Sequence, residues 1–219
     1  MTSTGARVQT AVVTGRHPFD VRGFHALFRS MGDIDYFPQH MEDFAADPRR
    51  AEYDVVVFYH FHQETPREDA PWYEAGIRPA MESLGETGQG ILVLHHAILA
   101  FPDWDYWADL VGIRDRSFGY HIGETLTVDV APIDHPITRG LSSWEMIDET
   151  YSMASAGPGS EALLTTEHER SMRALAWTRT HRNSRVFCLE SGHDNDTFTN
   201  ESFRTVLSRG IQWLAGRLD

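Results

Sequence analysis

Histidines follow three apolar segments of this chain at the points where the segments end. In chain order they are His60 and His62, then His95 and His96, then His193. An imidazole ring can bind a transition metal, exchange a proton near neutral pH or polarise a carbonyl group. If the three segments are neighbouring strands of one sheet, these rings meet at one edge and predict metal-assisted or acid–base chemistry there.

The first two histidines lie two residues apart, a spacing that turns both side chains to the same side if the strand continues. His60 and His62 are therefore able to clasp one metal ion. We predict both of them, together with His121, as ligands of a divalent ion such as zinc. The alternative is that they are solvated histidines in a loop at the end of the strand.

His95 and His96 come directly after four apolar residues and before a helical stretch. A turn between a strand and a helix is where α/β enzymes often expose a catalytic side chain. We predict His95 as a catalytic residue and His96 as a substrate-binding residue. The alternative is that these two histidines only end the strand.

The tripeptide Gly192-His193-Asp194 ends the last of the apolar segments. Glycine permits a backbone conformation that other residues avoid, and a carboxylate from Asp194 or Glu190 would orient the imidazole ring. We predict His193 as a catalytic residue and Asp194 as a substrate-binding residue. The alternative is a turn whose side chains only supply local hydrogen bonds.

Glu149 and Tyr151 lie on a predicted strand that begins near Trp144. Alternate residues of a strand share a side, so the carboxylate and the phenol face the same way and Asp148 faces the other way. Such a pair suits acid–base work on sugar hydroxyls, and we predict Glu149 as catalytic and Tyr151 as substrate-binding. His17, in the turn after the first strand, is a further substrate-binding candidate. Ordinary surface placement is the alternative for all three residues.

The elements that must position these side chains follow from the apolar patterns. Continuous apolar runs are typical of parallel strands covered on both faces, and apolar residues spaced by three or four indicate helices. Predicted strands of the core are 8–14, 34–37, 54–59, 91–94 and 185–190. Predicted helices are 20–31, 72–84, 97–111 with an interruption near Pro102, and 200–218 with Asn200 as N-cap. Further short strands are predicted at 123–131, 144–151, 162–166 and 174–178.

These elements predict an α/β fold, with a doubly wound, mostly parallel sheet and a β-rich extension. A length of 219 residues still allows a single hydrophobic core, and 41% of the residues are hydrophobic. We therefore predict one domain over residues 1–219.

Charge and composition exclude several classes of partner. The formal net charge is −13, from 32 acidic and 19 basic residues, so we expect neither nucleic acid nor a membrane as partner. No apolar run approaches the roughly 20 residues that span a bilayer, and the start of the chain lacks the pattern of a secretory signal. The single cysteine excludes an internal disulfide, and a cytoplasmic location is the expectation.

Two common kinds of site do not fit the sequence. Gly85, Gly88 and Gly90 precede a predicted strand, whereas a dinucleotide-binding loop follows one, so we expect no nucleotide cofactor. Cys188 lies in the middle of a predicted strand, and no Gly-x-Ser-x-Gly elbow occurs. Covalent chemistry on a cysteine or serine nucleophile is therefore disfavoured.

A set of short motifs runs in a defined order along nearly the whole chain. They lie at 54–62, 90–96, 135–141, 148–151, 176–177, 185–187, 192–194 and 203–215. Each motif is short, but the ordered set is fairly specific. In this order the motifs resemble those of the ThuA-like, or trehalose-utilisation, family.

The resemblance implies a class I glutamine-amidotransferase-like, flavodoxin-like fold. It also implies a role in sugar metabolism, often beside dehydrogenases that make 3-keto-glycosides. His95 matches the first histidine of the family's elbow, whereas His96 stands where some members have a smaller residue. The amidotransferase cysteine is thus replaced, and we do not expect glutamine amidotransferase activity.

Together these features favour an enzyme that acts on a small-molecule carbohydrate. The expected substrate is a keto-sugar or keto-glycoside, and the expected step is proton abstraction next to the carbonyl group, followed by isomerisation or elimination. A divalent ion would polarise the carbonyl or enediolate oxygen. Its ligands would come from His60, His62, His95, His121 and His193. Glu149 or His193 would move protons, and Tyr151 would bind sugar hydroxyls.

Two other function classes stay open. A non-catalytic sugar-binding or regulatory protein would bind a sugar without turnover, and a metal-dependent hydrolase would cleave a glycosidic or amide bond. A homo-oligomer is a further expectation, because Trp72, Trp104 and Trp107 suit an interface, although helix packing explains these residues equally well.

Overall fold

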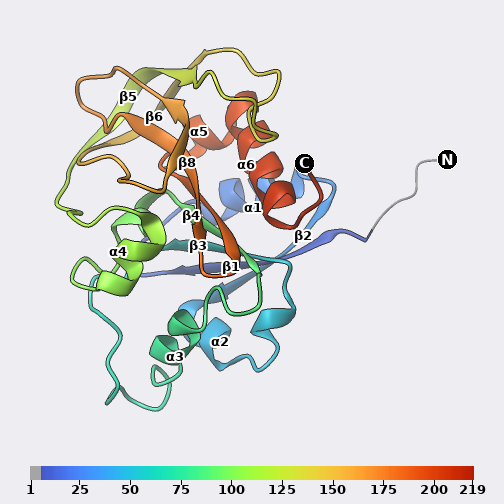
Figure 1. Cartoon of the computed structure of the whole chain (residues 1–219), viewed down its shortest axis with the longest axis vertical. Coiled ribbons are helices and arrows are strands. Elements are labelled where there is room, and N and C mark those ends of the chain that lie inside the picture. Colours follow the sequence, from blue (N-terminus) through green and yellow to red (C-terminus); the bar gives the residue numbers. More distant parts are fainter. Residues whose placement is uncertain (1–5) are drawn as a thin grey trace.

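A nine-stranded mixed sheet runs through residues 6–219, the part of the chain that the computed structural model describes (Figure 1). The strand order is β2-β1-β3-β4-β9-β8-β7-β5-β6. The strands are β1 (Val8–Gly15), β2 (Ile34–His40), β3 (Val55–His60), β4 (Gly90–Leu94), β5 (Gly119–Val130), β6 (Trp144–Ser152), β7 (Glu161–Thr165), β8 (Ala174–His181) and β9 (Ser184–Leu189). The helices are α1 (Val21–Arg29), α2 (Met41–Ala46), α3 (Ile77–Glu82), α4 (Asp105–Val111), α5 (Asn195–Phe198) and α6 (Glu201–Leu214), with short 3₁₀ segments η1 (Arg50–Glu52) and η2 (His95–Leu99). The predicted α/β fold class is confirmed.

The strands β2, β1, β3, β4 and β9 pair in parallel and form the half of the sheet that carries the predicted histidines. Every residue of β3 and β4 is buried. Strands covered on both faces read as continuous apolar runs in a sequence, and for this reason the predicted ends of both strands are nearly correct. The carboxyl ends of the parallel strands meet at one edge of the sheet, where ligands bind in such folds.

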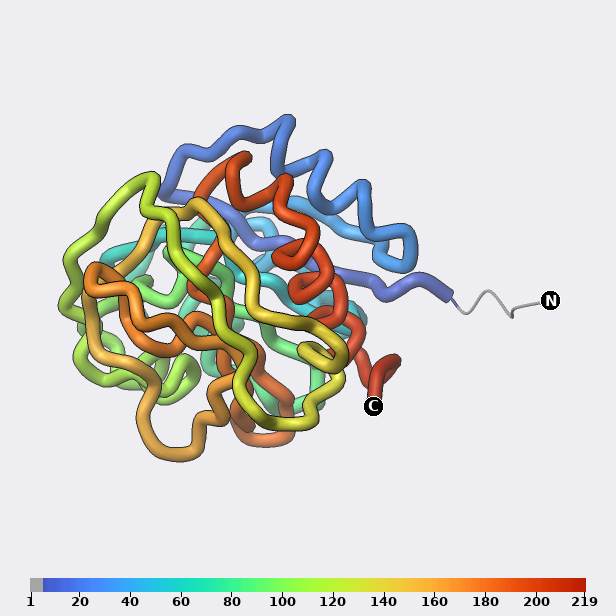
Figure 2. Tube along the Cα trace, turned by 90° about the horizontal axis from the view of Figure 1, so that it is seen from above, coloured from blue at the N-terminus to red at the C-terminus, as the bar shows by residue number. Residues whose placement is uncertain are grey.

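Helices cover both faces of the sheet. On one face α1 and α6 lie side by side, as Figure 2 shows, and bury Leu92 of β4 against residues such as Leu207. On the other face α2, α3 and α4 bury the next residue of the strand, Val93, with residues such as Met81. The alternation along each strand thus divides the core into two layers.

The predicted helix 72–84 is shorter in the structure, where α3 covers only its second half. The residues before α3 form turns that close on the carbonyl oxygen of Pro71. This oxygen accepts hydrogen bonds from the backbone N–H of Glu74 at 2.8 Å and of Ala75 at 2.9 Å. The apolar residues of this turn resemble the start of a helix in the sequence, and the predicted helix therefore begins too early.

The last predicted helix, 200–218, begins as expected but ends early. The side chain of Asn200 accepts a hydrogen bond from the backbone N–H of Phe203 at 3.0 Å, so the predicted N-cap is confirmed. The helix α6 ends at Leu214, because Gly216 adopts a φ of 66°, a left-handed conformation that stops helices.

The predicted β-rich extension is present, and it continues the main sheet. The strands β8, β7, β5 and β6 follow β9 in antiparallel pairs. The last of them, β6, folds back across the carboxyl edge of the parallel strands, since the N–H of Tyr151 donates to the Glu190 side chain at 3.0 Å. Thr197, in α5, also donates to the carbonyl oxygen of Ile147 at 3.0 Å. The extension therefore closes over the site edge.

The three tryptophans considered for an interface differ in burial. Trp107 is fully buried and Trp104 is 7% exposed, so helix packing accounts for both of them. Trp72 is 88% exposed, on the segment before α3. Only this one of the three is left as a candidate for contact with another chain.

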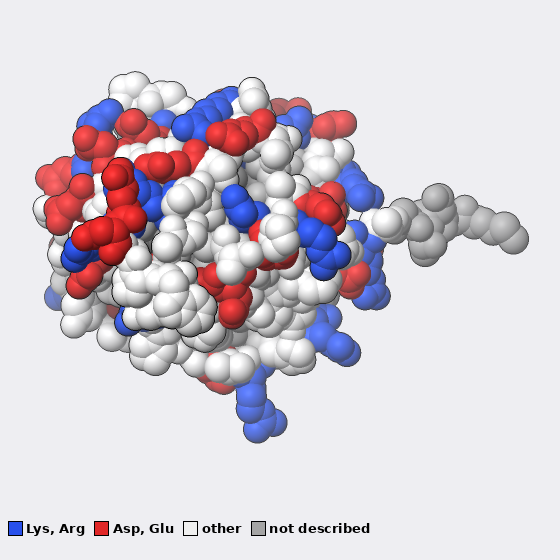
Figure 3. Space-filling view, turned by 90° about the horizontal axis from the view of Figure 1, so that it is seen from below, with Lys and Arg blue, Asp and Glu red and all other residues white. Residues whose placement is uncertain are grey.

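The helices and the surface charges are relevant to two expected partners, a membrane and nucleic acid. No helix within residues 6–219 combines the length and the apolar character that crossing a membrane requires. On the face that Figure 3 shows, acidic and basic side chains are interspersed. An interspersed surface with net negative charge offers little attraction to a phosphate backbone.

Candidate active site

Four side chains meet at the carboxyl edge of the parallel strands and form what we call the centre: His95, Glu149, Tyr151 and His193. The Nε2 atom of His95 lies 3.1 Å from Glu149 Oε2 and 3.3 Å from His193 Nδ1. The latter two atoms are 3.2 Å apart. The Tyr151 hydroxyl lies 2.9 Å from His95 Nε2 and 3.0 Å from Glu149 Oε2. The structure thus brings together side chains from three segments that are distant in the sequence.

Three strands position the centre. The strands β4 and β9 are parallel neighbours with Leu94 beside Leu189, so His95 and His193, which follow them, lie at the same edge. Glu149 comes from β6, which the extension lays across this edge. The centre therefore depends both on the parallel core and on the extension.

The backbone of His95 has a φ of 52°, in the left-handed region that residues other than glycine avoid. Such a conformation costs about 1–3 kcal/mol and persists only where the surroundings hold it. The ring Nδ1 lies 2.7 Å from the carbonyl oxygen of Glu190, which can only accept a hydrogen bond. Nδ1 therefore carries the proton, and in the neutral ring Nε2 presents a lone pair to the centre.

The donor atoms of the centre fit a divalent transition metal. The Glu149 carboxylate and the lone pair of His95 Nε2 face each other, so a proton or a cation must lie between them. Two imidazoles and a carboxylate form the protein ligands of several catalytic zinc sites. Tetrahedral zinc with bonds of about 2.0–2.2 Å separates its ligand atoms by roughly 3.3–3.6 Å. The three atoms of His95, Glu149 and His193 are 3.1–3.3 Å apart.

Burial and hydrogen bonding set the charge states at the centre. Burial opposes the charge of Glu149, but the hydrogen bonds with His193 and His95 outweigh it and hold the pKa of Glu149 below its usual value. The same hydrogen bond with Glu149 raises the pKa of His193. Burial raises the pKa of Tyr151 well above its usual value of 10.0, so the phenol keeps its proton and can donate it in a hydrogen bond.

The Asp148 side chain connects the strand that carries Glu149 with the turn that carries His193. Its buried carboxylate accepts hydrogen bonds from the backbone N–H groups of Glu149 at 2.9 Å, Gly192 at 2.8 Å and His193 at 3.0 Å. Gly192 has a φ of 129°, which other residues rarely adopt, as the sequence predicts for this turn. Sequence analysis gave Asp148 no role. The one available signal was its place next to Glu149 with its side chain on the opposite side of the strand.

His17 and His96 form a stacked pair beside the centre. Their ring centroids are 4.2 Å apart, and the His17 ring lies 6.2 Å from the ring of His193. His96 is buried, and neither of its ring nitrogens has a hydrogen-bond partner within residues 6–219. Burial lowers the pKa of His96 well below its usual value, so its ring is neutral. Both rings lie beside the centre, and their contact with a substrate stays a prediction.

The predicted metal ligands His60, His62 and His121 are placed differently. Within residues 6–219, the only group of at least three ligand side chains with atoms within 4.8 Å of one another is that of the centre. The Nδ1 atoms of His60 and His62 are 3.2 Å apart, but the His60 ring packs against Trp107, on the face that α4 covers. His121 lies on β5 with its Nε2 3.2 Å from the hydroxyl of Ser152. The structure thus places His60 beside His62, and His121 away from both.

Asp194 has a local structural role. Its carboxylate accepts a hydrogen bond from the backbone N–H of Asp196 at 2.9 Å and begins α5. This arrangement matches the alternative in which the turn supplies local hydrogen bonds. Its charge also acts on the centre, because it favours the protonated form of His193 and so raises the pKa of that ring.

His60 and His96 are expected to make the fold sensitive to acid. Both are buried, and this burial lowers the pKa of each ring well below its usual value of 6.5. The unfolded chain then binds more protons than the folded chain. Their contribution to the free energy of unfolding is therefore complete above about pH 6.5 and is lost as the pH falls below it. Each ring contributes a slope of up to about 1.4 kcal/mol per pH unit.

Urea unfolding between about pH 7 and pH 5 measures this slope. The variant His60→Gln removes one of the rings whose pKa burial lowers, and it is expected to flatten the slope by the share of that ring. The matched control is His121→Gln, at the half-exposed position on β5. Equal slopes in the wild-type protein and in His60→Gln would contradict the assignment of a buried, neutral His60.

The sequence matches the family model of ThuA, described as trehalose utilisation, over residues 20–214. This range runs from the N-cap of α1 to the end of α6 and includes all four residues of the centre. Among curated proteins, no sequence matches this chain.

Several solved structures are similar in fold. A ThuA-like protein from Parabacteroides merdae ATCC 43184 superposes with a TM-score of 0.76 at 20% identity, covering 97% of this chain and 91% of that one. A ThuA-like protein from Bacteroides uniformis ATCC 8492 gives a TM-score of 0.69 at 18% identity, with 95% and 92% covered. A glutamine amidotransferase from Thermotoga maritima gives 0.57 at 10% identity, with 94% and 98% covered. At these identities the likeness shows the fold, which is of the predicted amidotransferase-like kind.

Proposed function

This chain belongs to the ThuA family of trehalose-utilisation proteins, and on that premise we propose that it abstracts a proton next to the carbonyl group of a keto-sugar or keto-glycoside. The family relates the chain to the use of carbohydrates. The proposed reaction is inferred from the chemistry of the centre, and the keto-glycoside substrate from what the resemblance to the family implies.

The meeting of two imidazoles, a carboxylate and a phenol at one strand edge carries this proposal. Proton abstraction requires a base near the carbon that loses the proton and a positive or hydrogen-bonding group near the oxygen that gains charge. In the centre such groups lie between 2.9 and 3.3 Å from one another. The arrangement therefore supports acid–base chemistry on a small polar substrate.

We propose that one divalent metal ion, zinc or similar, is held by His95 Nε2, His193 Nδ1 and Glu149 Oε2. The kinds of donor atom and their spacing support this ligand set. Such an ion polarises a carbonyl group and stabilises the negative charge on its oxygen. Side chains of the protein carry out the proton transfers and bind the substrate.

In the proposed reaction the C–H bond next to the carbonyl group breaks and its proton passes to Glu149, whose second carboxylate oxygen, Oε1, is not among the proposed ligand atoms. The electron pair of that bond moves toward the carbonyl oxygen and gives an enediolate. Return of the proton to the former carbonyl carbon, with transfer of the hydroxyl proton from one oxygen to the other, completes an isomerisation. In an elimination the carbonyl group re-forms instead, and the substituent on the next carbon leaves with its bonding electrons and takes up a proton. Tyr151 keeps its proton and donates a hydrogen bond to a sugar oxygen. The rings of His17 and His96 lie beside the centre, and in this proposal they would contact the sugar hydroxyls.

The same donor set favours one other function, metal-dependent hydrolysis. Two histidines and a glutamate also hold the zinc of hydrolytic enzymes that keep a fourth position for water. The products separate the two reactions. Hydrolysis of a glycosidic bond releases two intact sugars, whereas the proposed reaction changes the position of the carbonyl group or introduces a double bond.

Metal analysis of the purified protein tests the ligand set. Elemental mass spectrometry is expected to find about one ion per chain in the wild-type protein and a large loss in His95→Ala and His193→Ala. The matched control is His121→Ala, which removes a histidine outside the centre. Full metal content in both centre variants would rule out these ligands.

Product analysis tests the reaction separately. A keto-glycoside made by oxidising one ring hydroxyl of trehalose is incubated with the wild-type protein and with the three variants. An isomerised or eliminated product is expected with the wild type and with His121→Ala, and strongly reduced amounts with the other two. Intact sugar products would favour the hydrolase, and no product from any keto-glycoside would exclude the proposed reaction.

A further inference from the structure

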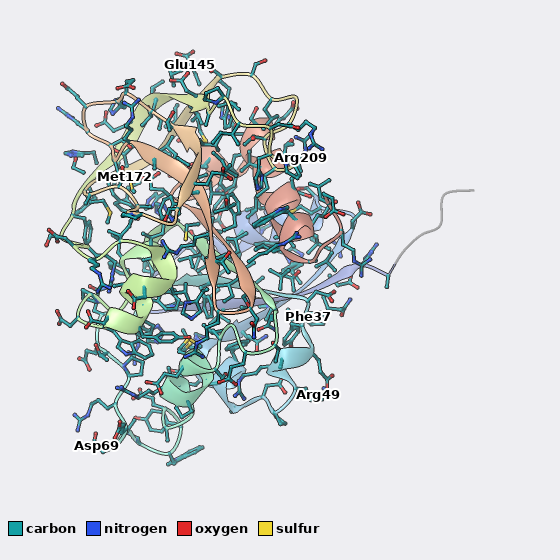
Figure 4. All side chains as sticks on the ribbon, in the orientation of Figure 1. Phe37, Arg49, Asp69, Glu145, Met172 and Arg209 are labelled. Atoms are coloured by element: carbon teal, nitrogen blue, oxygen red, sulfur yellow. The ribbon has the colours of Figure 1, made fainter. Side chains whose placement is uncertain are left out.

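A hollow of about 680 Å³ opens at the same edge of the sheet, on the side of α3. Its floor is formed by residues that follow β1 and β3, among them Arg16 and His62, and its outer wall by the segment between β3 and α3. Figure 4 shows Asp69 on the outer end of this segment, at the opposite end of the molecule from Glu145 in β6. The volume lies within the range of small-molecule sites, about 300–1,000 Å³.

Two hydrogen bonds to backbone carbonyl oxygens hold the wall of the hollow in place. The N–H of Phe101 donates to the carbonyl oxygen of His62 at 2.7 Å, which holds the start of the segment against the turn after η2. Further along, the guanidinium of Arg78 in α3 donates to the carbonyl oxygen of Pro66 at 3.1 Å. The hollow is therefore formed before any ligand arrives, as is usual for small-molecule sites.

Strained backbone is concentrated in the hollow and the centre. Within residues 6–219, the residues other than glycine with a positive φ are Arg16 at 61°, His95 at 52°, Phe101 at 49° and Arg182 at 52°. Arg16 and Phe101 line the hollow, and His95 belongs to the centre. Left-handed conformations of this kind cost about 1–3 kcal/mol each and gather at functional sites. The hollow thus carries the same mark of function as the centre.

The charged side chains that line the hollow are two guanidiniums, of Arg16 and Arg67, and three carboxylates, of Glu64, Asp69 and Glu74. Arg67 pairs with Asp69 at 2.6 Å, and Arg16 lies 3.6 Å from a carboxylate oxygen of Glu74. Burial lowers the pKa of His62 to about 4, so its ring is neutral at physiological pH. An anionic ligand such as a sugar phosphate would find no unpaired positive side chain among these groups. These charges therefore favour a ligand without negative charge.

The uncharged groups of the wall suit a sugar ring. Phe61, Ile77 and Phe101 offer apolar surfaces on which the C–H faces of a sugar can pack. Gln63 and Thr65 offer an amide and a hydroxyl, each able both to donate and to accept hydrogen bonds with sugar hydroxyls. Apolar faces beside such polar groups are what a pyranose ring requires.

Phe61 lies between the hollow and the His17–His96 pair beside the centre. Its ring lines the hollow, and its centroid lies 5.8 Å from the ring centroids of both His17 and His96. The ring of His96 in turn lies 5.3 Å from that of His95. We propose that the hollow binds the second sugar unit of an uncharged glycoside while the first unit reacts at the centre. The proposal rests on the proposed function and deepens it, because the substrate is then at least a disaccharide.

Sugar binding measured by isothermal titration calorimetry tests the hollow. The probes are trehalose, maltose and cellobiose, with glucose as the single-unit comparison. At least one disaccharide is expected to bind the wild-type protein about tenfold or more tightly than glucose. Ala70→Trp fills the hollow from its own wall and is expected to remove this difference. The matched control is Ala51→Trp, which places the same side chain in a separate, smaller hollow of about 170 Å³.

Gln63→Ala provides a second, milder variant in case Ala70→Trp does not fold. It is expected to weaken the binding of the same disaccharide about threefold or more, by loss of a hydrogen-bonding amide. Equal affinity for glucose and every disaccharide, no sugar binding to the wild type, or unchanged binding in both hollow variants would overturn the proposal. These sugars carry no keto group and are not substrates of the proposed reaction, so their binding is measured independently of turnover. Disaccharide binding through the hollow without conversion of any keto-glycoside would therefore refute only the proposed reaction.

Discussion

Glu149→Gln is expected to lower the turnover of a keto-glycoside by about 10²- to 10⁴-fold, the usual contribution of a general acid or base. Glutamine keeps the shape of the side chain but can neither accept the proton nor supply a negative charge to a metal ion. The amide can also place an N–H group where the carboxylate oxygen now accepts the Tyr151 hydroxyl at 3.0 Å. Both the proposed proton transfer and the proposed ligand set therefore lose an essential atom.

The matched control is Glu145→Gln, an exposed glutamate on the same strand, β6. Turnover rate, metal content and thermal unfolding are measured for both variants. Glu145→Gln is expected to match the wild type in all three, and Glu149→Gln to match it only in folding. A turnover within about tenfold of the wild type in Glu149→Gln would exclude this residue as the proton carrier.

The convergence of His95 and His193 was predictable from the sequence. β4 is apolar throughout, and so are the last four residues of β9. Such runs are typical of strands covered on both faces, and parallel strands of that kind share one carboxyl edge. Glycine at residue 192 likewise predicted the unusual backbone conformation found there. These inferences need only local patterns and one rule of topology.

The path of β6 was not predictable in the same way. Its alternation showed that Glu149 and Tyr151 share a side, and the hydrogen bond between them agrees with this. Which part of the sheet that side would face depends on strand pairings between distant segments, such as Asp129 of β5 with Thr165 of β7. Local patterns carry no information about such pairings.

The His60 and His62 pair shows a second limit. Their spacing correctly placed them together, since their Nδ1 atoms are 3.2 Å apart. The face on which they lie was hidden, because every residue of β3 is buried and no polar position marks one side of the strand. Alternation puts His60 on the same side as Phe58, against the layer formed by α2, α3 and α4. The apolar pattern of such a strand thus predicts that it lies inside the sheet, but it does not predict which face of the sheet each side chain is on.

Asp148→Ala is expected to lower the free energy of unfolding by about 3 kcal/mol or more. Removing the carboxylate leaves three backbone N–H groups without their acceptor, those of Glu149, Gly192 and His193. The cost of a buried polar group without a partner is about 1–3 kcal/mol. Urea unfolding followed by tryptophan fluorescence measures the change. The matched control is Asp134→Ala, whose carboxylate pairs with Arg139 at the surface and is expected to matter little.

Asp148→Asn separates stability from positioning. The amide keeps one oxygen as an acceptor but turns an NH₂ group toward a donor, so the expected loss of stability is smaller, about 1–2 kcal/mol. In the folded Asn variant, metal affinity is expected to fall about 10- to 100-fold, as for other residues that orient metal ligands. Disaccharide binding in the hollow should persist, since no residue of its wall bonds to Asp148. Wild-type metal affinity in this variant would show that the carboxylate supports the fold without placing Glu149 and His193 for chemistry.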